Sequence, residues 1–110
     1  MTQYVTLAER YRRKMEHMRS ALVEVDDLLT AYAREHGGRF IRYGSTAKGN
    51  ARGHSDVDII ADFPGEASFE AANYAEQLLF DRNLKPDVSP SGFISAKFIA
   101  RVEEGAVILS

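Results

Sequence analysis

Two aspartates one residue apart form a pair that could hold a cation. Asp56 and Asp58 lie in the segment SDVDIIADF, whose apolar residues predict a β-strand. Side chains at i and i+2 of a strand point to the same side, with their Cα atoms about 6.5 to 7 Å apart. Two ionised carboxylates this close raise each other's pKa unless a cation lies between them. Oxygen-only ligands favour a hard ion, Mg²⁺ or Mn²⁺, over zinc.

The residues before this pair could hold an anion. Gly44 and Ser45 separate a predicted strand from a short predicted helix. A glycine lets backbone approach a ligand closely, and the first N–H groups of a helix favour negative charge. A phosphate here would complete a nucleoside triphosphate site, with the cation between it and the aspartates. Further residues expected to contact the phosphates are Lys48, Arg52 and Ser55, and Arg42 is also near in sequence.

Other readings of these residues are weaker. The glycines match neither the G-x-x-x-x-G-K-[ST] phosphate loop nor a dinucleotide-binding fingerprint. Ser55 is expected to hydrogen-bond rather than act as a nucleophile, because no histidine and acid arrangement supports it. An isolated D-x-D is most often a solvated pair on an exposed strand, so the argument depends on the whole stretch.

Composition sets the class of protein. The chain has 110 residues, no cysteine and a net charge of −2, which predicts one domain in a reducing, cytoplasmic setting, without disulfides or thiolate zinc sites. No apolar run is long enough to span a bilayer. A basic segment at 39–54 runs directly into an acidic one at 55–76. The basic cluster at 11–14 favours a solvated helix face over nucleic-acid binding, since the chain is acidic overall.

Apolar periodicity predicts the elements that position the site. Residues 1–36 are predicted to be an N-terminal helical segment, with Thr6 and Glu9 as a capping box and Gly37-Gly38 as the end of the helix. Its apolar stripe packs either on the chain's own sheet or on a partner. A core at 38–109 has strands at 39–43, 57–63, 84–88 and 106–109 and helices at 46–50, 68–80 and 93–102. Pro86 indicates either an edge strand or the beginning of a strand, and 89–92 a break. This alternation predicts an α/β (α+β) fold, a small mixed β-sheet flanked by helices.

The stretch GSTAKGNARGHSDVDII resembles the signature of nucleotidyltransferases in the DNA polymerase β superfamily, in which Gly-Ser is followed ten residues later by Asp-x-Asp. The resemblance covers roughly residues 38–109 and is nearest to the minimal nucleotidyltransferase group. It implies two Mg²⁺ ions, or Mn²⁺, on catalytic carboxylates and transfer of NMP from an NTP, with ATP as the expected substrate, to a hydroxyl. The family's third carboxylate lies on a later strand, where Asp87 is the candidate.

The resemblance also implies a partner. Larger relatives carry a further domain that holds the acceptor, and we expect none in this chain. Minimal nucleotidyltransferases are usually paired with a helical HEPN ribonuclease toxin, which they neutralise by binding it and transferring AMP to it. We therefore expect an antitoxin. The alternative is a non-catalytic module of the same fold that neutralises a helical partner by complex formation alone.

Overall fold

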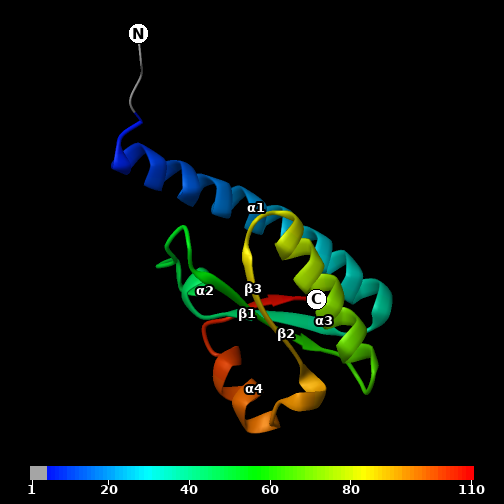
Figure 1. Ribbon diagram of the computed structural model, residues 1–110. Coiled ribbons are helices and arrows are strands. Elements are labelled where there is room, and N and C mark those ends of the chain that lie inside the picture. The colour runs from blue at the N-terminus through cyan, green and yellow to red at the C-terminus, as the bar shows by residue number, and fades with distance from the viewer. Residues whose placement is uncertain (1–4) are drawn as a thin grey trace.

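The long N-terminal helix begins and ends where the sequence predicts. The computed structural model describes residues 5–110 (Figure 1), and α1 (Leu7–His36) is one continuous helix. The Thr6 hydroxyl accepts a hydrogen bond from the Glu9 N–H at 3.1 Å. Gly37 ends the helix in the left-handed conformation, with φ of 73°, and donates its N–H to Ala33. Both ends are therefore determined by local capping chemistry.

Four strands form one mixed sheet in the order β3-β2-β1-β4. The strand β1 (Arg39–Tyr43) is antiparallel to both β2 (Asp56–Asp62) and β4 (Val107–Leu109). The helix α3 (Ala67–Asp81) connects β2 to β3 (Lys85–Pro90), which is parallel to β2. The small mixed sheet flanked by helices is confirmed, and β3 is an edge strand, as Pro86 indicated.

Most boundaries differ from the sequence prediction by one or two residues, and two of the differences have a local cause. The break expected at 89–92 is wrong for Ser89 and Pro90, which continue β3, because an edge strand tolerates proline. A short turn, η1 (Ser91–Phe93), follows it. The last helix, α4 (Ala96–Glu103), begins three residues later than predicted because the Ser95 hydroxyl caps it by accepting from the Phe98 N–H at 3.1 Å.

The helices α1 and α3 cover one face of the sheet, and α4 lies against the other (Figure 1). Alternation along β1 directs Phe40 to the α1 face and Tyr43 to the α4 face. The core between α1, α3 and the sheet includes Val25, Leu29, Phe40, Val57, Ile59, Ala61, Phe63, Ala75 and Leu79. The stripe on α1 therefore packs on the chain's own sheet from Met18 onward.

The first turns of α1 are different. Leu7 is 78% exposed and Tyr11 is 48% exposed, and this part of the helix projects beyond the sheet (Figure 1). The predicted partner contact is thus possible only for this end of the helix.

A close contact at the start of β1 depends on a missing side chain. Gly38 lies against the ring of Phe63, and a Cβ at position 38 would overlap that ring. Phe63 is 3% exposed and packs edge-on against Phe40 and Tyr32. The ring therefore has no room to move.

We predict that Gly38→Ala lowers the free energy of unfolding by about 1–3 kcal/mol, because it overpacks this contact. Urea denaturation measures the change. Gly92→Ala is the matched control, since a Cβ there meets nothing nearer than 3.4 Å. Equal stability of Gly38→Ala and the parent protein would contradict the packing described here.

Candidate active site

The register of β2 and β3 brings two carboxylates side by side. Asp58 pairs with Asp87 across the parallel strands, and on its other side Asp58 pairs with Tyr43 of β1. Neighbouring strands are about 4.8 Å apart, and paired residues present their side chains on the same face. Asp56, two residues earlier on β2, shares that face and is exposed. The face is the one that α1 and α3 leave uncovered.

The site concentrates negative charge. The pKa of Asp58 is raised from 3.8 to about 6, first by burial, then by a hydrogen bond and charge repulsion from Asp87, and last by repulsion from Asp56. The pKa of Tyr43 is also raised, first by burial and then by Asp58 and Asp87. A bound cation would relieve this repulsion.

Gly44 forms a tight contact with the same carboxylate. Its φ of 75° and ψ of −153° lie in a region open essentially to glycine alone. A Cβ at this position would overlap Oδ2 of Asp58. The chain then enters α2 (Ser45–Lys48), so the Gly44-Ser45 backbone lies directly beside the carboxylates.

The other predicted phosphate-binding residues lie in α2 and in the loop that follows it. Ser45 is half-buried at the start of α2, whereas Lys48 and Arg52 are exposed in and after it. The Ser55 hydroxyl accepts a hydrogen bond from the Arg52 N–H at 2.7 Å. Ser55 therefore has a structural role in the turn that leads into β2.

Arg42 is not brought to this site. It points to the α1 face, where Nε and Nη2 donate to the two carboxylate oxygens of Asp26 at 3.0 and 2.7 Å. Strand alternation explains the difference, because Arg42 and Tyr43 are neighbours and must face opposite sides.

The carboxylates fit an open magnesium site better than a metal site closed by protein ligands alone. Within residues 5–110, no three His, Cys, Asp or Glu side chains are gathered into a ready metal site. The structure instead holds Asp58 close to Asp87, with Asp56 beside them opposite Lys85. Magnesium is usually bound through one or two carboxylates, with waters and substrate phosphates completing its shell. The residues therefore fit a Mg²⁺ that arrives with a nucleotide.

Tyr43 was missed in the sequence analysis. Its ring meets Phe98 of α4 edge-on, with centroids 6.1 Å apart, beside Asp58. Its position directly before the Gly44-Ser45 turn, at the end of a predicted strand, could have identified it as a site residue. An aromatic wall next to the carboxylates is a suitable surface for a flat ligand.

A charged network positions α4 over this face. Arg39 donates to Asp62 at 2.8 Å and also pairs with Glu103 of α4. Asp62 shares the face of Asp56 and Asp58, but its ion pair with Arg39 gives it a structural role.

The metal-free protein should lose stability as pH rises through the Asp58 titration. The pKa of Asp58 is raised from 3.8 to about 6 in the folded state, so folding favours the protonated carboxyl. That contribution is complete below pH 3.8 and is lost by the time pH has passed about 6. We expect a loss of about 1 kcal/mol, after allowance for solvent screening.

Urea denaturation in the presence of EDTA, between pH 4 and 7, measures this change. Asp58→Asn should fold normally and lack this component of the pH dependence. Parallel curves for the two proteins would contradict the assignment.

We predict that Gly44→Ala destabilises the fold by about 1–3 kcal/mol, because it adds backbone strain and a clash with Asp58. Thermal denaturation measures the effect. Gly49→Ala is the control, since Gly49 also has a positive φ but a Cβ there meets nothing within 4 Å. An equal effect at both positions would show that strain alone acts and that the Asp58 contact is unimportant.

Comparison with known proteins agrees with the geometry. A family model described as a nucleotidyltransferase domain matches residues 25–109. The match covers the sheet, α2 to α4 and every predicted site residue. Searches of curated proteins and of solved structures gave no match. Since the family match spans most of the chain, the protein belongs to the nucleotidyltransferase domain family of the polymerase β-like superfamily.

Proposed function

We propose that this protein is a Mg²⁺-dependent nucleotidyltransferase that moves AMP from ATP to a hydroxyl group on a partner protein. The observation that carries the proposal is the pairing of Asp58 with Asp87 on adjacent strands, directly against the Gly44 backbone. A site for nucleotidyl transfer needs carboxylates that bind a metal ion and a backbone segment that can approach the phosphates closely.

Each residue has a distinct task. Asp58 and Asp87, with Asp56, would hold one or two magnesium ions. Bound magnesium would neutralise the triphosphate and lower the pKa of the attacking hydroxyl. Gly44 and Ser45 would seat the phosphates.

The proposed transfer makes one bond and breaks one bond at the α-phosphorus. The acceptor oxygen forms a bond to the α-phosphorus as the bond from that phosphorus to the pyrophosphate oxygen breaks. Asp87, the more exposed of the facing pair, accepts the hydroxyl proton as general base. Lys48 and Arg52 are exposed cations that offset charge on the departing pyrophosphate.

For the acceptor we propose a helical toxin of the HEPN type, which would make this protein an antitoxin. The exposed Leu7 and Tyr11 on the projecting end of α1 support a helical partner, because apolar side chains on an amphipathic helix pack well against another helix. Within residues 5–110, no helix is long and apolar enough to cross a membrane. The cysteine-free composition supports a cytoplasmic setting.

Transfer is tested with ATP labelled at the α-phosphate, Mg²⁺ and the candidate toxin. Asp56→Asn and Asp58→Asn should each lower labelling at least about a hundredfold, a typical loss when a group that stabilises transition-state charge is removed. Asp62→Asn is the matched control, since Asp62 lies on the same strand and face but is paired with Arg39. Undiminished labelling in the Asp58 variant would refute the mechanism.

A second candidate function is a binding module of the same fold without turnover. The exposure of Asp56 favours it. A stable complex with the toxin, unlabelled with every nucleotide tested and unaffected by Asp58→Asn, would establish this alternative.

A further inference from the structure

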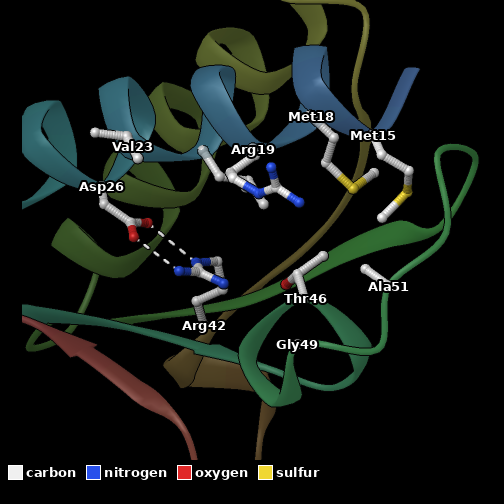
Figure 2. A pocket seen from close by; sticks show the side chains of 10 residues that line it. Met15, Met18, Arg19, Val23, Asp26, Arg42, Thr46, Gly49 and Ala51 are labelled. Atoms are coloured by element: carbon white, nitrogen blue, oxygen red, sulfur yellow. Dashed lines mark hydrogen bonds and ion pairs between the residues drawn. The ribbon is translucent and has the colours of Figure 1, made fainter. Parts of the chain in front are cut away.

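A cavity lies beneath α1, on the sheet face opposite the carboxylates. Its volume is about 260 Å³. Figure 2 shows side chains from α1 on one side, and Arg42 and Thr46 on the other, facing this space. The lining residues are Met15, Met18, Arg19, Leu22, Val23, Asp26, Arg42, Thr46, Gly49 and Ala51.

Two buried polar atoms at the cavity lack partners. Arg42 is only 7% exposed, and its pair with Asp26 uses Nε and Nη2. The remaining nitrogen, Nη1, and the hydroxyl of Thr46 are buried and make no hydrogen bond to any residue in 5–110. Buried donors left unpaired cost stability, so native structures usually supply an acceptor.

Water is a poor match for most of the wall of this cavity, which is partly open to solvent. A water molecule takes about 30 Å³ of liquid, so the cavity corresponds to roughly nine waters. Most of its wall is apolar, from Met15, Met18, Leu22, Val23 and Ala51. A ligand with an apolar body and one polar end satisfies both parts of the cavity.

The charges in the cavity lining indicate what the polar end of such a ligand would be. The lining carries Arg19 and Arg42 against Asp26, a surplus of one positive charge. A guanidinium binds a carboxylate with good geometry. The thioethers of Met15 and Met18 make favourable contacts with aromatic rings.

We propose that this cavity binds a small apolar monocarboxylate, with an aromatic body preferred, whose carboxylate accepts from Arg42 Nη1 and from Thr46. The site is separate from the nucleotidyl-transfer site and does not depend on the function proposed for it. The short segment from Arg42 to Thr46, the end of β1 and the start of α2, links the two sites along the chain.

The proposal is tested by NMR titration of the ¹⁵N-labelled full chain at pH 7.5 and constant ionic strength. Phenylacetate is the probe, with 2-phenylethanol as the uncharged analogue, 2-phenylethylamine as the cation and inorganic phosphate as an anion without an apolar body. Phenylacetate should shift the amides of α1 around Met18 and of Arg42–Thr46 saturably. Its Kd should be at least about fivefold lower than that of any other compound.

Variants separate a built site from weak surface binding. Thr46→Val removes an unpaired buried hydroxyl, so it should fold well, and it should raise the Kd for phenylacetate about fivefold. Arg19→Gln should raise it about threefold. Arg13→Gln is the control, an exposed arginine of the same helix outside the cavity lining, and should leave the Kd unchanged.

Three results would overturn the proposal. These are no saturable shifts at about 20 mM phenylacetate, equal binding of phosphate or the amine, and equal effects of Arg13→Gln and Thr46→Val.

Discussion

Asp58 and Asp87 repel each other when both are ionised, and the fold must hold them together against that repulsion. The parallel pairing of β2 and β3 does so with backbone hydrogen bonds, and the pairing places the two residues directly opposite each other. The force that keeps these strands in place comes from the other face of β2, where Val57, Ile59 and Ala61 are fully buried under α1 and α3. Hydrophobic burial on one face therefore maintains an unfavourable charge arrangement on the other, which makes that charge available to a cation.

Strand alternation separates two kinds of chemistry. On the α4 face lie the acids, Gly44 and the Arg39 network that holds α4. On the α1 face lies the pair of buried Arg42 and half-buried Asp26, next to the cavity. A buried ion pair adds little net stability, but removal of one partner is costly because the other charge is left unpaired. Arg42 is thus held in position, while its Nη1 has no hydrogen-bond partner among residues 5–110.

The helix α1 has two parts with different surroundings. From Met18 to Ala33 it supplies one wall of the core, and near Leu7 and Tyr11 it extends past the sheet. Between these parts, Met15 and Met18 form the roof of the cavity. The apolar stripe of α1 therefore lines the core, the cavity and an exposed surface in turn, because the 30-residue helix is longer than the strands, of which β2 has 7 residues.

The sequence by itself determined the elements whose causes are local. Thr6 and Gly37 cap α1 through contacts within a few residues. The spacing from Gly-Ser to Asp-x-Asp can be recognised from the sequence alone. Tertiary structure alone decided that Asp87 lies opposite Asp58, that Arg42 turns to Asp26, and that Arg42 and Thr46 border a cavity. These outcomes depend on strand register and on which face the helices cover. Both are set by burial of residues far apart in the chain, so no short stretch of sequence contains them.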